Sequence, residues 1–306
     1  WMLLETVEDM RLSLGVTTSM PVEDSIYLAR LAETGDYHRV WVGEDLQGKD
    51  VFSYLSVLAC KTRSIGLGTG ITSPWVRNLG VIANSAAGIQ ALSGERFILG
   101  LGVGGLPELL RLTGSKPRKM VARMNEIVRL LRRIFNGVEV THHGDFNSLR
   151  GYELAFEVSS PKIYFGVRGP MMLKLAGEIA DGVIFSGPLK FITRDVKIME
   201  EAAEEKGRNP GEIDRVLWNP FILTENSEDL DLARDVVSVI LGSMPHSAHE
   251  FPGGGKIDEL CVYGSKREIM KKLSEYEALG FRELVIGPPY GRNPGDVVAS
   301  FGGMGE

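Results

Sequence analysis

The run from Gly166 to Ile184 holds the residues best suited to chemistry, because a glycine-rich turn lies there between an apolar strand and the start of a helix. Lys162–Gly166 is the expected strand, and Pro170 suits the first turn of a helix, where its missing N–H is not needed. Free backbone N–H groups would converge beside Gly169 and bind a phosphate, with Arg168 adding positive charge. A tight strand-to-helix turn without a ligand is the alternative.

The elements that must position this turn alternate along the chain between strand and helix patterns. The predicted strands are Arg11–Val16, His38–Gly43, Ile65–Ile71, Arg96–Gly102, Lys162–Gly166, Gly182–Ser186, Arg215–Leu223 and Glu283–Gly287. The predicted helices are Val22–Gly35, Asp50–Thr62, Leu79–Leu92, Arg118–Asn136, Pro170–Ala180, Thr193–Lys206, Leu230–Leu241 and Lys266–Leu279. A polar insertion at 137–160, with a short hairpin around Tyr152–Val158, precedes the fifth strand.

Eight apolar strands, each covered by a helix, predict an α/β fold in which a parallel sheet closes into a (β/α)8 barrel of the triosephosphate-isomerase (TIM) type. We expect one domain over residues 1–306, and a doubly wound open sheet is the alternative. In such a barrel the chemistry lies at the C-terminal ends of the strands. Several of these ends are rich in glycine, which would let the backbone approach a large flat ligand with a phosphate tail.

Composition narrows the kind of partner. The chain has 306 residues, of which 43% are hydrophobic, and a net charge of -6. We therefore expect a small-molecule ligand and no nucleic acid, which would need clustered Lys and Arg. No apolar run is long enough for a membrane span, and the first ten residues carry acids where a signal peptide would be basic, so a cytoplasmic, soluble protein is predicted.

Four segments resemble the bacterial-luciferase-like superfamily, and within it the methylenetetrahydromethanopterin reductases that use the deazaflavin coenzyme F420. They are Val40-Trp-Val-Gly-Glu-Asp45 with Asp50-Val-Phe52, Leu67-Gly-Thr-Gly-Ile-Thr-Ser-Pro-Trp-Val-Arg77, Ser93-Gly-Glu-Arg-Phe-Ile-Leu-Gly-Leu-Gly102 and Gly169-Pro-Met-Met-Leu-Lys-Leu-Ala-Gly-Glu-Ile-Ala-Asp-Gly182. The last segment is the one typical of the reductase branch. The resemblance covers nearly the whole chain.

This resemblance implies a luciferase-like barrel with the deazaflavin at its C-terminal mouth. It implies a non-proline cis peptide bulge at Gly70-Ile71, behind the central ring of the cofactor. The family's phosphate contacts correspond here to five residues on two strand ends: Gly102, Gly104, Gly166, Arg168 and Gly169.

The chain departs from the family at two positions. Relatives usually carry an Asp-His pair after the second strand, and here the pair is Glu44-Asp45. Relatives also tend to carry a carboxylate after the Gly-x-Gly of the fourth strand, where this chain has Gly105, and Glu108 is the nearest acid. Glu44 is therefore the first candidate to give a proton to the substrate, with Asp45 beside it; a rim carboxylate paired with Arg77 or Lys49 is the alternative.

Other reactive side chains point to no further site. Cys60 and Cys261 are far apart in apolar sequence and are expected to be buried thiols, and no metal site is predicted. The histidines of His142-His143 and His246-Ser-Ala-His249 are expected to be solvated loop residues.

Three functions remain open. The first is hydride transfer between coenzyme F420 and a small substrate, with methylenetetrahydromethanopterin as one candidate. The second is a monooxygenase that uses flavin mononucleotide (FMN) and oxygen, and the third is a flavin-binding protein without catalysis. A homo-oligomer is expected in each case.

Overall fold

The computed structural model describes residues 10–224, 228–232, 234–235, 262–288 and 293–302. Eight parallel strands close into a barrel in the order β1-β12-β9-β8-β7-β4-β3-β2. Their bounds are β1 Arg11–Thr17, β2 Arg39–Gly43, β3 Gly66–Thr69, β4 Phe97–Leu101, β7 Lys162–Gly166, β8 Gly182–Phe185, β9 Asp214–Leu217 and β12 Glu283–Ile286. The predicted TIM barrel is thus confirmed, with all eight strands near their expected positions.

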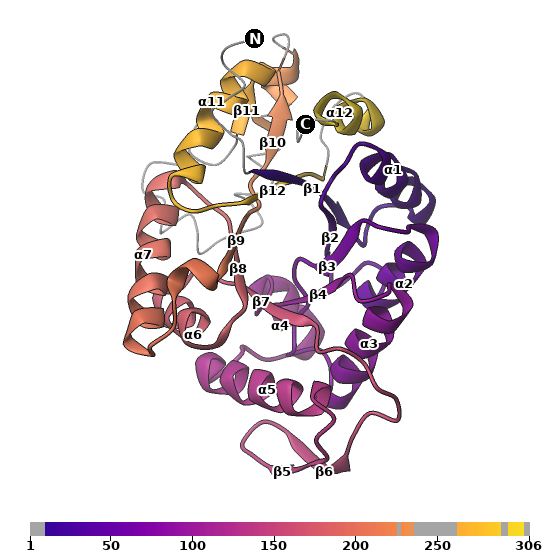
Figure 1. Cartoon of the computed structure of the whole chain (residues 1–306), viewed down its shortest axis with the longest axis vertical. Helices are drawn as coiled ribbons and strands as arrows, with labels where there is room; N and C mark the ends of the chain where they lie inside the picture. Colours follow the sequence, from indigo (N-terminus) through magenta and orange to yellow (C-terminus); the bar gives the residue numbers. More distant parts are fainter. Residues whose placement is uncertain (1–9, 225–227, 233, 236–261, 289–292, 303–306) are drawn as a thin grey trace.

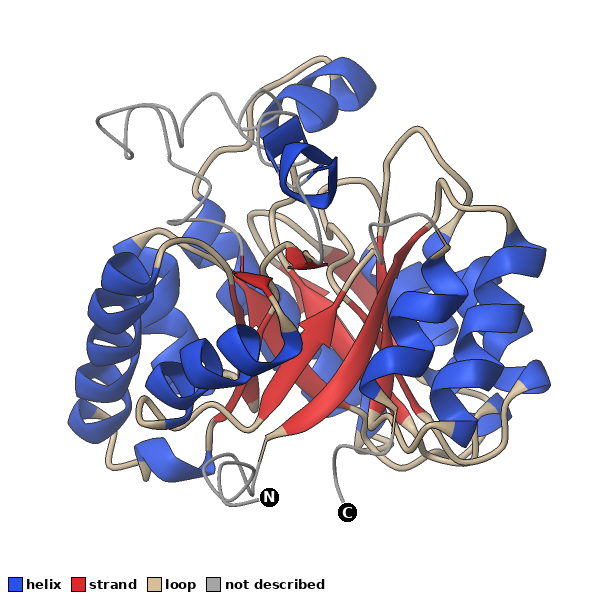
Figure 2. Cartoon of the chain, turned by 90° about the horizontal axis from the view of Figure 1, so that it is seen from above, coloured by secondary structure: helices blue, strands red, loops and turns tan. Residues whose placement is uncertain are grey.

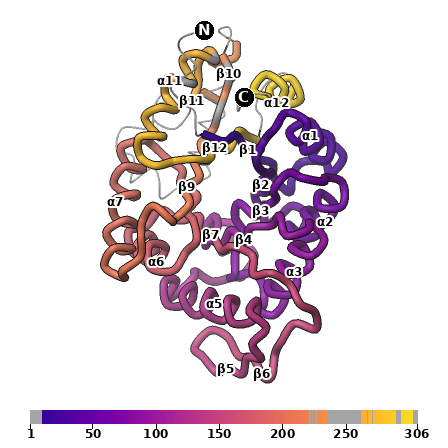
Figure 3. Tube along the Cα trace, in the orientation of Figure 1, coloured from indigo at the N-terminus to yellow at the C-terminus, as the bar shows by residue number. Residues whose placement is uncertain are grey.

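Helices surround the strands, and the chain travels once around the ring in sequence order (Figures 1 and 3). They are α1 Val22–Thr34, α2 Val51–Lys61, α3 Leu79–Leu92, α5 Met120–Phe135, α6 Pro170–Ile179, α7 Leu189–Glu205, α11 Lys266–Glu277 and α12 Pro294–Phe301. Figure 2 shows the strands tilted inside this outer layer. Polar side chains start several helices; the Asp50 carboxylate, for example, accepts from the Ser53 N–H at the start of α2.

The core has two parts. Apolar side chains on the outer faces of the strands pack against the helices, while a smaller cluster fills the barrel itself. That inner cluster comprises Trp41, Ile98, Tyr164, Ile184, Val216 and Val285, with Ile71 and Trp218 packed against it from the mouth. The barrel interior is therefore a packed core, and ligands must bind at its mouth.

The base of the barrel holds a buried polar cluster. Arg39 at the start of β2 forms an ion pair of 2.6 Å with Glu283 at the start of β12. The same carboxylate accepts hydrogen bonds of 2.6 Å from the Ser13 hydroxyl and from Nε1 of Trp41. Three neighbouring strands are thus joined by one carboxylate, which pairs the Ser13 hydroxyl, the Trp41 indole and Nη1 of Arg39 at this end of the core.

Two elements differ from their predicted positions. The hairpin of the insertion is formed by β5 Val140–His143 and β6 Ser148–Tyr152, so its prediction around Tyr152–Val158 was wrong. The predicted strand Arg215–Leu223 is two strands, because β9 ends at Leu217 and β10 Phe221–Leu223 pairs with β11 Val262–Gly264. Pro220 lies between them and cannot donate to a ladder.

Other sequence predictions also need correction or fall partly outside the described residues. Helices α4 Leu106–Thr113 and α12 were not predicted. Cys60 is exposed, so its prediction as a buried thiol was wrong, because it lies on the outer face of α2. Of the predicted helix Leu230–Leu241, residues 230–232 and 234–235 are helical, and the remainder lies outside the described residues, as do Cys261, His246 and His249.

Candidate functional site

A cavity of about 350 Å³ lies at the C-terminal ends of β2, β3 and β4. Its lining residues come from three loops and from the first turn of α4: Glu44, Asp45, Leu46, Ile71, Ser73, Gly104, Gly105 and Glu108. The structure thus brings together four of the nine residues predicted for the site, namely Glu44, Asp45, Ile71 and Gly104. The other five lie outside this lining, two of them at the ends of β3 and β4 and three at the end of β7.

The Gly70-Ile71 peptide is cis, as the resemblance predicted. The Ile71 side chain borders the cavity and packs on Gly102 and Gly166. A Cβ atom at Gly102 would lie 2.9 Å from Cγ1 of Ile71, and one at Gly166 would collide with Cγ2. These two glycines therefore make room for Ile71 beside the cavity.

Gly104 and Gly169 have the open space that a ligand would need. Gly104 has a left-handed backbone with φ of 82°, and the nearest atom to a Cβ placed there would be Cβ of Ser73 at 3.8 Å. A Cβ placed on Gly169 would meet no atom within 4 Å. Gly169 is the N-cap of α6, and its carbonyl accepts from the Met172 and Leu173 N–H groups. Because Pro170 has no N–H, the Met171 N–H is the donor of the first turn that remains for a ligand.

Arg168 lies next to this helix start and is oriented by the end of β8. Its Nε and Nη2 atoms donate to the Ser186 hydroxyl at 3.2 and 2.6 Å. The guanidinium is therefore held beside the N-terminus of α6. A positive side chain and a helix N-terminus together suit a phosphate.

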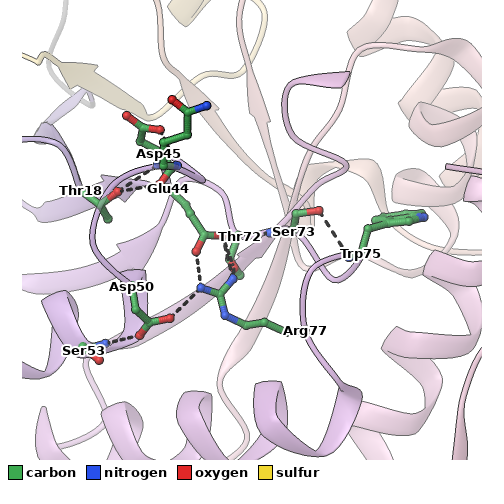
Figure 4. A network of polar contacts seen from close by, with 10 residues as sticks. Thr18, Glu44, Asp45, Asp50, Ser53, Thr72, Ser73, Trp75 and Arg77 are labelled. Carbon is green, nitrogen blue, oxygen red and sulfur yellow. Dashed lines mark hydrogen bonds and ion pairs between the residues drawn. The ribbon is translucent and has the colours of Figure 1, made fainter. Parts of the chain in front are cut away.

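Glu44 lies in a compact ion-pair network (Figure 4). Its Oε1 atom accepts from Nη2 of Arg77, and its Oε2 atom accepts from Nη1 of Arg77 at 2.9 Å and from the Thr72 hydroxyl at 2.8 Å. The same guanidinium forms an ion pair of 2.7 Å with Asp50. Burial alone would lower the pKa of Arg77, but its hydrogen bonds to Glu44 and Asp50 raise it.

The network gives Glu44 a positioning role. Its side chain is only 4% exposed, and both of its oxygens are occupied as acceptors. Because Asp50 also caps α2, the network connects the end of β2 with the start of α2 and with the loop after β3. The pair with Arg77 is the alternative that the sequence left open for Glu44.

Asp45 is exposed and also bound locally. The Ser19 hydroxyl donates to Oδ2, and the Gln47 N–H donates to Oδ1 at 2.9 Å. These two hydrogen bonds lower the pKa of Asp45, the one from Ser19 most, against a smaller opposing effect of burial. Asp45 therefore holds the loop between β2 and α2 as an anion.

Glu108 is the third carboxylate of the cavity, and sequence reasoning noted it only as the nearest acid. It lies in the first turn of α4, and its Oε2 atom folds back over Gly105, where a Cβ would collide with it. No hydrogen bond or ion pair joins Glu108 to another residue in the part of the chain that the structure describes. Of the three carboxylates, this is the one with lone pairs open toward the cavity.

Trp218 is a further residue of the mouth that the sequence did not single out. Its ring covers Gly70 and Gly15, and its Nε1 atom donates to the Gly287 carbonyl at 2.6 Å. The signal was present in the glycines, because side chains at Gly15 and Gly70 would leave no room for an indole. Trp218 closes the inner wall of the barrel mouth.

Metal sites and membrane spans find no support in the described residues. In the described residues, no group of three or more His, Cys, Asp or Glu side chains is placed to hold a metal ion. The described helices include none that is long and apolar enough to cross a membrane.

The open glycines of two neighbouring strand ends, the start of α6 and Arg168 fit a phosphate, and the cavity beside Ile71 fits a ring.

Comparison with known proteins identifies the family. The model of the luciferase-like monooxygenase family matches residues 3–283. The chain is 31% identical to the 5,10-methylenetetrahydromethanopterin reductase of Methanolobus tindarius, over 90% of this chain and 93% of the relative. It is 27% identical to the F420-dependent glucose-6-phosphate dehydrogenase of Kineococcus radiotolerans, over 87% and 83% of the two chains.

Solved structures share the fold. The coenzyme F420-dependent tetrahydromethanopterin reductase from Methanopyrus kandleri has a TM-score of 0.83 at 21% identity, covering 97% of this chain and 98% of its own. An F420-dependent secondary alcohol dehydrogenase, solved with an F420-acetone adduct, has a TM-score of 0.85 at 18% identity, covering 97% and 99%. On the family match and the 31% identity, this chain belongs to the luciferase-like monooxygenase family.

Proposed function

We propose that this protein is an oxidoreductase that transfers a hydride between coenzyme F420 and a small substrate. The observation that carries the proposal is the open space at Gly104 and Gly169, on two neighbouring strand ends, which would suit a phosphate beside a cavity bordered by Ile71. The relatives support this proposal. The names of the Kineococcus radiotolerans glucose-6-phosphate dehydrogenase and of the Methanopyrus kandleri tetrahydromethanopterin reductase both specify dependence on coenzyme F420.

The bound deazaflavin would supply the hydride chemistry, and the chain supplies position and charge. Gly104, Gly169 and the start of α6 would hold the phosphate, with Arg168 oriented by Ser186 to neutralise it. Gly102 and Gly166 allow Ile71 to lie beside the cavity, and Gly70 allows Trp218 to close the wall behind it. The two apolar side chains, Ile71 and Trp218, would limit the access of water to the place where a hydride would move.

The proton that some substrates need would come from a carboxylate of the cavity. Glu44 and Asp45 were predicted for this role, and their assignment stays a prediction. Both already serve as acceptors, Glu44 toward Arg77 and Asp45 toward Ser19. Glu108 borders the same cavity and has no such partner among the described residues, so we add it to the candidates.

The substrate that we propose is methylenetetrahydromethanopterin, which the name of the Methanolobus tindarius relative specifies. The support is the 31% identity over 90% of this chain. We also propose that the protein assembles with copies of itself and works in the cytoplasm. Light scattering during gel filtration would measure the assembly, and a monomer would refute it.

The decisive experiment is a parallel titration of the purified protein with F420 and with FMN, followed by the fluorescence of each cofactor. We expect F420 to bind and to be oxidised or reduced when methylenetetrahydromethanopterin or its product is added. Tight FMN binding, with oxygen consumption by the reduced complex, would instead identify a monooxygenase. F420 binding without turnover on any one-carbon pterin, secondary alcohol or sugar phosphate would identify a binding protein.

A further inference from the structure

A second and larger cavity, of about 600 Å³, lies on the other side of α4. We call it the basic cleft; it is lined by Trp75, Leu109, Thr113, Gly114, Ser115, Lys116, Pro117, Arg118, Arg123 and Phe146. Three of these residues are cationic, and none is acidic. None of the residues assigned to the first cavity lines it.

The cations of the cleft lack anionic partners in the described chain. Residues 111–123 hold five Lys or Arg residues and no Asp or Glu, in a protein whose net charge is -6. Among the described residues, only Lys119 of the five forms an ion pair, of 3.1 Å with Asp145, and Lys119 does not line the cleft. Small and apolar residues separate these cations along the sequence, which is why they did not stand out there as a group.

Arg123 is the most constrained of the three cations. Its guanidinium lies 5.2 Å from the centre of the Trp75 ring, and its Nη2 atom donates to the Pro74 carbonyl at 3.2 Å. Burial lowers the pKa of Arg123, and the negative charge of Glu126 offsets this only in part. A cation that is kept at a desolvation cost without a carboxylate partner is suited to a charged ligand.

Two buried donors of the same cleft also lack acceptors. Nε of Arg123 and Nε1 of Trp75 are both inaccessible to solvent and have no hydrogen-bond partner among the described residues. The Trp75 indole points away from the network of Glu44 and Arg77 (Figure 4). Buried donors are nearly always paired in folded proteins, so these two are exceptions in the wall of the cleft. Because neither atom is accessible to solvent, the case for an anionic ligand rests on the three cations that line the cleft without an ion pair among the described residues.

The basic cleft is a neighbour of the first cavity. Residues 73–75 and helix α4 separate the two, since Ser73 and Glu108 line the first cavity while Trp75 and Leu109 line the cleft. The Ser73 hydroxyl accepts from the Trp75 N–H at 3.4 Å, so the two walls are joined directly. A flexible chain attached to a ligand in the first cavity would therefore reach the cleft by crossing residues 73–75 or helix α4.

We propose that the basic cleft binds a short chain of carboxylates. Lys116 and Arg118 would meet the outer carboxylates, and Arg123, fixed by Trp75 and Pro74, the inner one. The acidic glutamyl tail of coenzyme F420 and a free oligocarboxylate share this chemistry. The inference that the cleft binds carboxylates depends on the cleft alone. The inference that these carboxylates belong to the F420 tail also rests on the proposed function.

The first arm of the test compares F420 that carries several tail glutamates with the form that carries none, by fluorescence titration at low salt. We expect the wild type to bind the tailed form about tenfold more tightly, as two or three partly exposed charge pairs would provide. In Lys116→Ala/Arg118→Ala, which keeps only Arg123 of the three cations, this ratio should fall to about two while the affinity for the tail-free form is kept. Raising the salt should lower the wild-type ratio too.

The matched control is Arg133→Ala. Arg133 is exposed on α5, about 15 Å along the helix from Arg123, and lies outside the cleft. Its removal changes the net charge in the same direction and should leave the ratio unchanged. An equal fall in Arg133→Ala would mean a general charge effect and would overturn the proposal.

The second arm titrates triglutamate alone into the protein by calorimetry. Binding that is lost in Lys116→Ala/Arg118→Ala, together with equal affinity for both F420 forms, would support the site with a free oligocarboxylate as its ligand. If no F420 form binds, the proposed function fails, and this arm still tests the cleft. The absence of triglutamate binding, with no preference for the tailed cofactor, would refute the proposal.

Discussion

At the scale of residues, the three carboxylates of the first cavity can be ranked by what already holds them. We expect Glu108→Gln to lower kcat about a hundredfold or more with methylenetetrahydromethanopterin, because general acid catalysis contributes at least this much. Glu44→Gln should lower stability through the loss of the pair with Arg77, and Asp45→Asn should alter the loop locally. The measurement is kcat and the F420 dissociation constant for the three variants side by side.

The ranking can fail in a defined way. A hundredfold loss in Glu44→Gln with unchanged F420 affinity and unchanged thermal midpoint would return the acid role to Glu44. Normal kcat in all three variants would remove the proton donor from this cavity altogether.

Gly105 offers a way to move the Glu108 carboxylate without changing its chemistry. Its φ of -66° suits alanine, but a Cβ would collide with Oε2 of Glu108, which is the flexible end of a side chain. We expect Gly105→Ala to change the free energy of unfolding by less than about 1 kcal/mol and to lower kcat. In the Glu108→Gln background, Gly105→Ala should have little further effect on kcat, and full additivity of the two losses would contradict the role of Glu108.

At the scale of elements, the start of α6 can be tested with two substitutions that differ only in charge. Gly169 has open space around it, so both Asp and Asn fit. Gly169→Asp should weaken F420 binding about tenfold or more, because it places an anion at the helix N-terminus where the phosphate would lie, whereas Gly169→Asn should weaken it much less. Equal losses in the two variants, measured by fluorescence titration, would point to steric exclusion instead.

Helix α1 is connected to the start of β3 by a single carboxylate. Glu33 accepts from the backbone N–H groups of Arg63, Ser64 and Ile65 at 2.7 to 3.0 Å. Burial opposes its ionisation, but these hydrogen bonds, with that of Ile65 the largest, lower the pKa of Glu33 from 4.5 to about 2. The pKa is lower in the folded state, so the stabilisation is present above about pH 4.5 and is lost as the pH falls toward 2.

Glu33→Gln should therefore lower the free energy of unfolding by about 1 kcal/mol at pH 7, a modest value because the carboxylate is partly exposed. Urea unfolding of the two proteins at pH 7, 5 and 3 checks the sign. The difference between them should shrink at pH 3. A difference that grows as the pH falls would show that the hydrogen bonds do not depend on the charge.

The elements that the sequence predicted well are those whose signal is local. Each barrel strand is an apolar run bounded by turn residues, and all eight appear in order. Helix α4 was missed because its eight residues follow a glycine-rich loop and bury only Leu109 fully. The continuation past Leu217 was read as one strand because β10 is also apolar, although Pro220 marks the break in the sequence; the pairing of β10 with β11 confirms it.

The site was predictable where backbone conformation decides it and less so where side chains choose between partners. The cis peptide at Gly70-Ile71 and the open glycines followed from motifs. The pairing of Glu44 with Arg77, 33 positions along the chain, was one of two alternatives that spacing could not separate. The basic cleft depends on Trp75, α4 and Phe146 meeting in space, for which the sequence holds no local pattern.

At the scale of the whole molecule, the polar cluster at the base of the barrel joins its first and last strands. Glu283 is 6% exposed and binds Arg39, Ser13 and Trp41. Glu283→Gln should lower the free energy of unfolding by about 3 kcal/mol, because it leaves the Arg39 charge buried without a counter-charge. Urea unfolding measures it, and the exposed pair of Lys119 and Asp145 provides the control.

The control is Asp145→Asn, which should change the free energy of unfolding by less than about 0.5 kcal/mol. The Lys119 and Asp145 side chains are both about 70% exposed, so their ion pair contributes little. A loss in Glu283→Gln as small as the control's would mean that the hydrogen bonds from Ser13 and Trp41 hold the base of the barrel without the charge.

The three described tryptophans can serve as intrinsic fluorescence probes of three parts of the molecule. Trp41 reports on the base of the barrel, Trp218 on the mouth and Trp75 on the cleft, and each has different neighbours. Variants that keep one indole at a time would give emission from one depth only. In the variant that keeps Trp218, energy transfer to a bound deazaflavin would lower the emission when the ring binds. In the variant that keeps Trp75, a change in emission on adding triglutamate would report the binding of carboxylates. The rates of the two binding events could thus be measured separately.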